Sequence, residues 1–235
     1  MPEWLDVFIL AVIEGITEFL PISSTGHMLI IQNWLKHPQS DLFLAVVQSG
    51  AVLAVVLVFT ERLKQIFLQW RDPETQQFVF KLGAAFCITA AGGLILKKLD
   101  WELPETAVPV ALATLIGGIL ILWIEFALRG KPLKDSVGWS VALALGAGQL
   151  LAVIFPGLSR SGTTILMALA LGVGRRPATE FSFLLGVPTL LSAASLEVAS
   201  ALLKPDLAAP PNWGMILWGT FVAAVTAFIA VKWLL

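Results

Sequence analysis

Two short polar segments in an otherwise apolar chain contain the residues able to do chemistry. The first, EGITEFLPISSTGH from Glu14 to His27, holds two carboxylates, two serines and an imidazole. The second, PGLSRSGTT from Pro156 to Thr164, places Arg160 among hydroxyls and glycines. An ionised side chain at membrane depth costs about 2.5–3.5 kcal/mol in insertion experiments, so these residues are functional candidates.

The two carboxylates of the first segment, Glu14 and Glu18, are four residues apart and therefore share one face of a helix. Two carboxylates held close at low dielectric either share a proton or hold a cation between them. A hard divalent ion, Mg²⁺ or Ca²⁺, suits an all-oxygen site that phosphate and water complete. The alternative is that one glutamate pairs with a distant basic residue for structure alone.

The run after Pro21 is typical of a helix start, with Ser23 or Ser24 as N-cap and free backbone amides beyond it that attract anions. His27 follows Ser24 by three residues on the same face. The imidazole is therefore a candidate to accept a proton from the serine or to give one to a leaving group. Ordinary helix capping and a buried neutral histidine are the alternative.

The second segment has the composition of a phosphate site, with a guanidinium, hydroxyl donors and another helix N-terminus. The predicted phosphate ligands are Arg160, Ser159, Ser161, Thr163 and Thr164, together with Ser23 of the first segment. Alternatively, Arg160 only neutralises Glu14 or Glu18. Gln48 and Gln149 have apolar neighbours in the sequence, and either orient the carboxylates or join helices by hydrogen bonds.

The elements that position these residues are predicted to be membrane helices. Hydrophobic residues make up 57% of the 235 residues and charged residues 13%, against about a quarter charged in soluble domains. Apolar stretches close to the roughly 20 residues that cross a bilayer occupy 42–59, 79–96, 107–128, 181–203 and 213–235. Only helices satisfy the backbone of such open chains in lipid, so an all-α integral membrane protein follows. A net charge of −1 argues against a nucleic-acid partner.

Regions 5–34 and 138–173 both read as an apolar helix, a break and a second apolar helix. Aligned without gaps, the matched pairs, each 135 residues apart, are Glu14 with Gln149, Pro21 with Pro156 and Ser24 with Ser159. This similarity predicts a single membrane domain, 1–235, made of inverted-topology repeats that each begin with a re-entrant helical hairpin. The first repeat, 1–130, has three spans after its hairpin, and the second, 138–235, has two.

The basic residues of the loops indicate the orientation in the membrane. Ten lie on one side of the predicted topology: Arg62, Lys64, Arg71, Lys81, Arg129, Lys131, Lys134, Arg175, Arg176 and Lys232. Four lie on the other: Lys36, Lys97, Lys98 and Lys204. The richer side is cytoplasmic by the positive-inside rule. The first hairpin then enters from outside and the second from inside, and their tips meet near the midplane.

Together the two segments resemble the signature motifs of the undecaprenyl pyrophosphate phosphatase family, the bacitracin-resistance membrane phosphatases, and the stretch RRPATEFSFLLGVP from Arg175 to Pro188 extends the likeness. The resemblance implies removal of the terminal phosphate from a C55 isoprenyl pyrophosphate, which recycles the lipid carrier of peptidoglycan synthesis. It implies a multi-pass protein of the bacterial inner membrane, dependent on a divalent metal, with its active site open toward the outer face. The family's catalytic residues fall on Glu14, Glu18, Ser24, His27 and Arg160, with the glutamates also as metal ligands.

One departure from the family pattern is that no further spanning helix follows 213–235. The rival function is a transporter or flippase of undecaprenyl phosphate, because broken helices that meet at the midplane are also transporter architecture. Whether the chain forms a homodimer is left open by the sequence.

Overall fold

Ten α-helices make up the regular structure in this computed structural model, which describes residues 2–35, 39–99, 107–203 and 210–235. They are α1 (Glu3–Thr17), α2 (Ser24–Trp34), α3 (Asp41–Val58), α4 (Thr60–Leu68), α5 (Pro73–Lys98), α6 (Ala107–Ala127), α7 (Trp139–Ile154), α8 (Arg160–Ala170), α9 (Arg175–Leu203) and α10 (Trp213–Leu234). The described residues contain no β-strand, so the predicted all-α class is confirmed.

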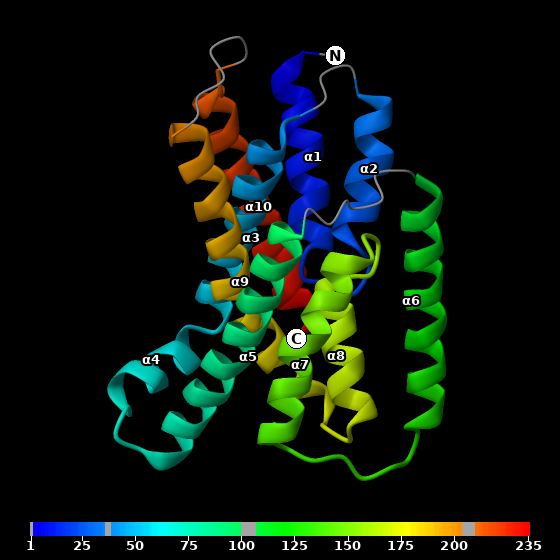
Figure 1. Cartoon of the computed structure of the whole chain (residues 1–235), viewed down its shortest axis with the longest axis vertical. Coiled ribbons are helices and arrows are strands. Elements are labelled where there is room, and N and C mark those ends of the chain that lie inside the picture. The colour runs from blue at the N-terminus through cyan, green and yellow to red at the C-terminus, as the bar shows by residue number, and fades with distance from the viewer. Residues whose placement is uncertain (1, 36–38, 100–106, 204–209) are drawn as a thin grey trace.

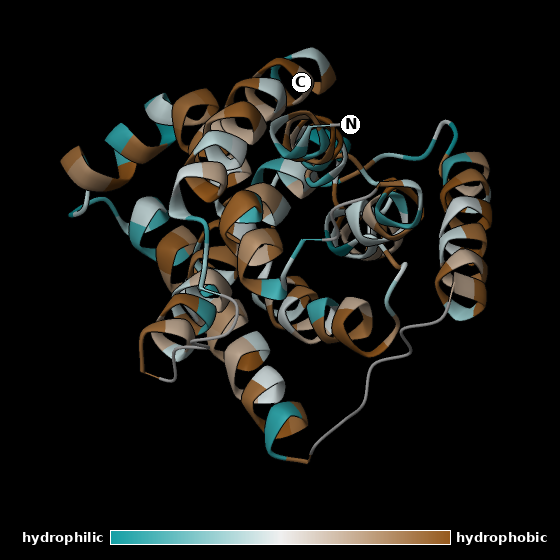
Figure 2. Cartoon of the chain, turned by 90° about the horizontal axis from the view of Figure 1, so that it is seen from above, coloured by the Kyte–Doolittle hydropathy of each residue, from teal (hydrophilic) through white to brown (hydrophobic). Residues whose placement is uncertain are grey.

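Five of these helices, α3, α5, α6, α9 and α10, are long and apolar enough to cross a membrane. Large apolar side chains such as Leu122 and Phe221 point outward from them, and Figure 2 shows apolar residues on the outer sides of the helices as well as inside. A helix that is apolar all round fits a lipid environment. The multi-pass membrane class is therefore confirmed. The short helix α4, between α3 and α5, was not anticipated.

The other four helices form two hairpins that enter the molecule from opposite ends (Figure 1). Helices α1 and α2 run from the upper end to the middle and back, and α7 and α8 do the same from the lower end. The division into two inverted repeats stays a prediction. Of the basic residues that support the orientation, Lys36 and Lys204 lie outside the described residues.

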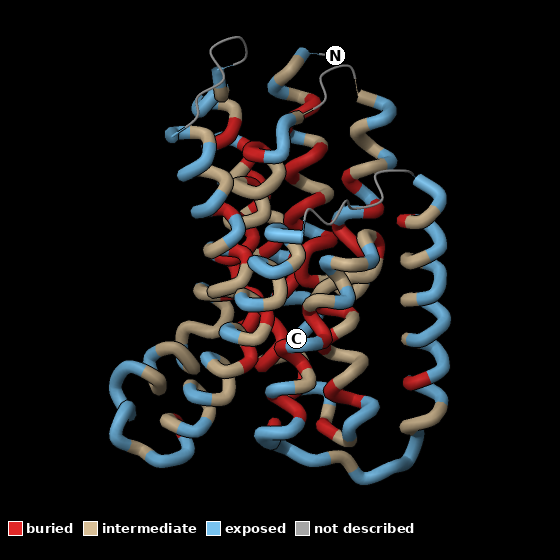
Figure 3. Tube along the Cα trace, viewed as in Figure 1, coloured by how far each residue is buried: buried red, intermediate tan, exposed pale blue. Residues whose placement is uncertain are grey.

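Small residues let the spanning helix α10 pack closely against α1 of the first hairpin and against α3. A Cβ on Gly15 of α1 would lie 2.5 Å from the Ala223 carbonyl oxygen of α10, and one on Gly50 of α3 would lie 2.4 Å from that of Thr220. Close backbone approach of this kind is how helices associate in lipid. Figure 3 shows the buried residues along this central axis, whereas α6 is exposed along most of its length. The hairpin tips are thus held in the packed centre.

Candidate active site

The tips of the two hairpins are joined by hydroxyls of the second. Ser161 is fully buried at the start of α8, and its Oγ donates to the carbonyl oxygen of Leu20 at 3.2 Å and to that of Glu18 at 3.4 Å. Ser159 Oγ also contacts the Leu20 carbonyl oxygen, at 3.4 Å. These bonds add to the one that the Leu20 carbonyl oxygen accepts from the Ile22 amide, at 2.8 Å, within the non-helical turn after α1. They fix the second tip on the first.

Each half-helix at the tips begins with a serine cap. Ser23 Oγ accepts from the Gly26 amide and Ser159 Oγ accepts from the Gly162 amide, both at 3.1 Å. The two cap residues are 136 positions apart, whereas the gapless sequence alignment used an offset of 135. The alignment is therefore wrong in this turn, because the second hairpin has one more residue between its proline and its cap. Ser23 also has φ of 65°, the left-handed region that a serine adopts only at a cost.

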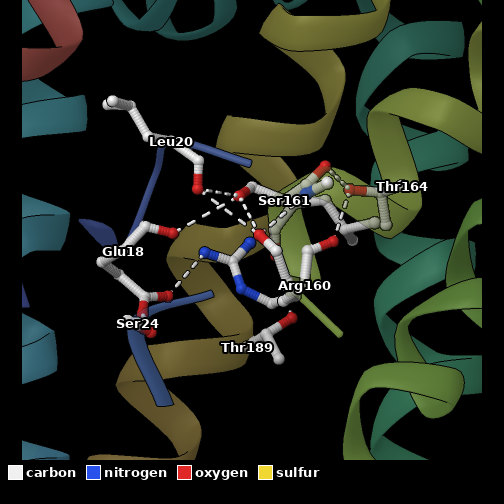
Figure 4. Close-up of polar contacts among 10 residues, drawn as sticks. Glu18, Leu20, Ser24, Arg160, Ser161, Thr164 and Thr189 are labelled. Carbon is white, nitrogen blue, oxygen red and sulfur yellow. Dashed lines mark hydrogen bonds and ion pairs between the residues drawn. The ribbon is translucent and has the colours of Figure 1, made fainter. Parts of the chain in front are cut away.

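Glu18 is the centre of the polar contacts between the hairpins (Figure 4). Its Oε1 accepts from Arg160 Nη2 at 3.0 Å, and its Oε2 accepts from the Ser24 hydroxyl at 2.7 Å. The side chains of Arg160 and Glu18 are 12% and 5% exposed, which makes this a buried ion pair. The ion pair between Arg160 and a glutamate, predicted as an alternative role of this arginine, is therefore present.

The guanidinium of Arg160 nevertheless keeps donors for a second anion. Its Nε and Nη1 are buried and have no hydrogen-bond partner. The group lies over the Phe19 ring, 5.3 Å from its centroid, and against Gly186 of α9, where a Cβ would come within 2.3 Å of Nη1. Since a buried unpaired donor costs about 1–3 kcal/mol, these nitrogens are suited to a ligand that brings oxygens.

Glu14, one turn before Glu18, is 1% exposed and lies within hydrogen-bonding reach of Glu18 and Gln48. Its Oε1 has no partner. Carboxylate and hydroxyl oxygens are the ligands that Mg²⁺ and Ca²⁺ prefer, so the donors present fit a divalent cation on Glu14 and Glu18. Within the described ranges no group of three or more His, Cys, Asp or Glu residues forms a metal cluster, so further ligands would come from phosphate and water.

A polar cavity of about 110 Å³ lies at these contacts. Its lining residues are Glu18, Ser23, Ser24, Thr25, Gln48, Ala152, Leu158, Ser159, Arg160 and Leu190. An apolar groove of about 640 Å³ shares Ser23, Leu158 and Ser159 with it and runs between α2, α6 and α8. The site therefore combines a small polar end with a large apolar one.

His27 is not bonded to Ser24. Its Nδ1 lies 2.8 Å from the Ser23 carbonyl oxygen, and since a carbonyl only accepts, Nδ1 is the donor and Nε2 remains an acceptor. The ring is exposed and lines the apolar groove. The proton acceptor that the structure gives Ser24 is Glu18, which corrects the expected Ser24–His27 pair.

Three of the expected phosphate ligands do not line the polar cavity. Thr164 Oγ1 donates to the Arg160 and Ser161 carbonyl oxygens of its own helix, as helical threonines commonly do. Ser161 is used in joining the tips, and Thr163 lines the apolar groove. Ser23, Ser159 and Arg160 remain at the cavity.

The two glutamines have different surroundings. Gln48 lies in the cavity wall beside Glu14. Gln149 Nε2 donates to Thr89 Oγ1 of α5 at 2.8 Å, and Thr89 donates in turn to the Gly146 carbonyl oxygen. Gln149 therefore joins α7 to α5 and does not orient the carboxylates.

Two contributors were not predicted from the sequence, Thr25 in the cavity wall and Gly186 beside the guanidinium. Thr25 follows Ser24 directly, and its position in the first motif was the available signal. Gly186 lies 26 residues after Arg160, on another helix, and only the packing of α8 on α9 brings the two together.

Comparison with known proteins gives one consistent relationship. The model of the bacitracin resistance protein BacA family matches residues 7–235. A Rhizobium etli protein named undecaprenyl-diphosphatase is 48% identical, over 99% of this chain and 88% of its own length. Relatives of the same name from Xylella fastidiosa and Xanthomonas axonopodis pv. citri are 44% and 41% identical over the full chain and over 90% and 88% of their own lengths. With its two hairpin motifs and this match, the chain belongs to the bacitracin resistance protein BacA family.

Proposed function

We propose that this chain hydrolyses undecaprenyl diphosphate, a C55 isoprenyl pyrophosphate, to undecaprenyl phosphate and inorganic phosphate. Family membership and the shared name of its relatives support this activity. The observation that carries it in the structure is that Ser24 and Arg160, from different hairpins, donate to the two oxygens of Glu18 at the end of an apolar groove. A hydroxyl beside a carboxylate acceptor and an arginine with free donors is what phosphoryl transfer requires.

The substrate's two ends fit the two parts of the site. The diphosphate would occupy the polar cavity, where Arg160 Nε and Nη1, Ser159 and the amides at the starts of α2 and α8 offer donors. The isoprenyl tail would lie in the apolar groove between α6 and α8. His27 lies in the wall of that groove, with its Nδ1 bonded to the Ser23 carbonyl oxygen.

In the mechanism we favour, the Ser24 oxygen attacks the terminal phosphorus while its proton passes to Glu18 Oε2. The new Ser24 Oγ–P bond replaces the bond from phosphorus to the bridging oxygen, and undecaprenyl phosphate leaves. Glu18 gives this proton up to solvent before the second step. Water then attacks the phosphoserine and gives a proton to Glu18, which passes it to the Ser24 oxygen as the Ser24 Oγ–P bond breaks and phosphate leaves. Arg160 stabilises the charge that spreads over the phosphoryl oxygens in both steps.

A divalent cation, Mg²⁺ or Ca²⁺, would be held by Glu14 and Glu18, and when bound it would offset the charge of the diphosphate. The alternative order, in which water attacks directly and Ser24 only positions the phosphate, uses the same residues. Trapping of a phosphoserine at Ser24 by rapid acid quench separates the two mechanisms.

We place the protein in the bacterial inner membrane with the polar cavity open toward the outer face, because the loops on the side of the second hairpin carry more basic residues. The product there would return to the lipid carrier cycle of peptidoglycan synthesis, and this recycling would confer bacitracin resistance. A flippase for undecaprenyl phosphate is less favoured, since transport needs no nucleophile and the relatives are named as diphosphatases.

The test is phosphate release from undecaprenyl diphosphate, or from the C15 farnesyl diphosphate, by the purified protein in detergent. We expect release with Mg²⁺ or Ca²⁺ and none with EDTA. Folded wild-type protein that releases no phosphate at any cation concentration would contradict the proposed activity, and release unaffected by EDTA would contradict the cation.

A further inference from the structure

Both carboxylate oxygens of Glu18 accept hydrogen bonds from the protein itself. One accepts from Arg160 and the other from Ser24, and the pair with Arg160 is nearly excluded from water. A buried ion pair of this kind is not readily exchanged for a solvated ion, because separating its partners leaves a buried charge uncompensated. Any cation that uses Glu18 must therefore compete with the guanidinium.

Charge alone makes this competition unfavourable to a cation. A divalent ion on Glu14 and Glu18 and the Arg160 guanidinium would use the same carboxylate, and two like charges side by side in a buried site repel strongly. The guanidinium lies over the Phe19 ring and against Gly186, and within the described part of the chain Glu18 is the carboxylate with which it forms an ion pair. The carboxylate pair is thus a poor cation site while Arg160 is bonded to Glu18.

A phosphate changes this balance. The unpartnered Nε and Nη1 of Arg160 can each donate to a phosphate oxygen, and the phosphate brings negative charge that offsets the charge of the guanidinium. Less of the guanidinium charge then opposes a cation at Glu18 Oε1, which accepts from Arg160 Nη2, and at Glu14 Oε1, which is buried without a hydrogen-bond partner. Bound phosphate therefore favours cation binding at the two glutamates, and a bound cation favours phosphate binding at Arg160.

Resting on the proposed function, we propose that Arg160 couples cation binding to substrate binding. Its ion pair with Glu18 excludes divalent cations from the carboxylate pair until a diphosphate binds to the guanidinium. The cation then enters with the substrate or after it. By thermodynamic reciprocity, the cation must strengthen diphosphate binding by the same factor.

The coupling can be measured by binding. Free Mn²⁺ is followed by electron paramagnetic resonance with the full chain in detergent, with and without farnesyl methylenediphosphonate, whose bridging CH₂ prevents cleavage. The double variant Glu14→Gln/Glu18→Gln lacks both carboxylates and gives the background from Mn²⁺ bound by the analogue itself. We expect the analogue to raise the Mn²⁺ affinity of the wild type by about 5–150-fold above this background, the usual range of coupling between sites.

Two variants at Arg160 separate charge from geometry. Arg160→Met removes the competing charge, so we expect tighter Mn²⁺ binding than in the wild type without the analogue and little further change when it is added. Arg160→Lys keeps the charge, so Mn²⁺ should stay excluded until the analogue binds. Wild-type Mn²⁺ affinity that is unchanged by the analogue overturns the proposal, even if the Arg160 variants do not fold.

Hydrolysis of farnesyl diphosphate by the same wild-type preparation distinguishes failure of the proposed coupling from failure of the proposed function. Phosphate release without coupling leaves the proposed function standing and overturns the role of Arg160. Coupling without phosphate release supports the role of Arg160 and contradicts the proposed function.

Discussion

The two hairpins share one turn chemistry and differ in the residue that it presents to the site. Ser23 and Ser159 each cap a half-helix through a glycine amide three residues on. The residue after the cap is Ser24 in the first hairpin and Arg160 in the second, and both side chains donate to Glu18. One local scaffold used twice thus supplies a hydroxyl from one side and a cation from the other.

The helices before the turns differ more. Glu14 of α1 is buried beside Glu18, whereas Gln149, its sequence counterpart in α7, is bonded to Thr89 of α5. The polar residue at this position therefore lies at the candidate site in the first hairpin and joins two helices in the second. We conclude that the active site is asymmetric although the hairpins are alike.

The largest effect on activity is expected from removing the charge of Glu18, which both hairpins contact. Glu18→Gln keeps the shape but cannot take a proton from Ser24, so we expect kcat to fall by about 10²–10⁴-fold, the usual contribution of a general base. The matched control is Glu180→Gln, which loses an ion pair with Arg62 outside the site. If the two variants had the same kcat in the phosphate-release assay, Glu18 would not be the base.

The next effect concerns the arginine of the second hairpin. Arg160→Lys keeps a positive charge but loses the planar fork, so we expect kcat/KM to fall by about 10–100-fold, the cost of one charge-assisted hydrogen bond. Arg62→Lys is the control, because Arg62 also pairs with a glutamate and lies over a phenylalanine ring, that of Phe78. Equal loss in both variants would mean a structural role for Arg160.

A smaller effect is expected where α9 makes room for the guanidinium. Gly186→Ala adds a Cβ 2.3 Å from Arg160 Nη1, so the arginine must leave its rotamer at a cost of about 0.5–1.5 kcal/mol. We expect kcat/KM to fall by about 2–10-fold. Gly93→Ala, where a Cβ would meet nothing within 4 Å, should leave kcat/KM unchanged, and a matching loss there would exclude this explanation.

The smallest effect on activity is expected in α7. Gln149→Leu removes the bond to Thr89, so thermal unfolding in detergent should show a stability loss of about 1 kcal/mol while kcat stays within about twofold of the wild type. Glu14→Gln, at the matched position of the first hairpin, should lower kcat and weaken Mn²⁺ binding in the presence of the diphosphonate. Equal effects of the two substitutions would remove the asymmetry between the hairpins.

Much of this arrangement could be predicted from sequence, since the membrane helices follow from apolar length and the breaks from proline, glycine and serine. The sequence also singled out Glu14, Glu18, Ser24 and Arg160, which the structure brings together at the hairpin tips, because buried polar and charged groups need a partner or a function. Their roles in catalysis stay a prediction. Helical spacing wrongly paired His27 with Ser24, since Glu18, six residues before the serine, lies closer across the turn. The spacing of residues along the sequence does not predict contacts that depend on the geometry of a turn or on tertiary packing.

The same limit explains the hydroxyls of α8. A serine or threonine near a helix start can bind a ligand, its own helix or a neighbouring turn, and sequence does not choose among them. Thr164 bonds its own helix and Ser161 bonds the first hairpin. The contact of Gly186 with Arg160 likewise depends on how α9 packs against α8.

The most direct test of the convergence on Glu18 is phosphate release from undecaprenyl diphosphate by Ser24→Ala compared with Ser23→Ala. The two serines are adjacent, but the Ser24 hydroxyl donates to Glu18 whereas Ser23 caps α2. We expect Ser24→Ala to lose at least about 10²-fold in kcat and Ser23→Ala to lose about 1 kcal/mol of stability while kcat stays within about tenfold. Near-wild-type kcat in Ser24→Ala, with the protein folded, would contradict the account.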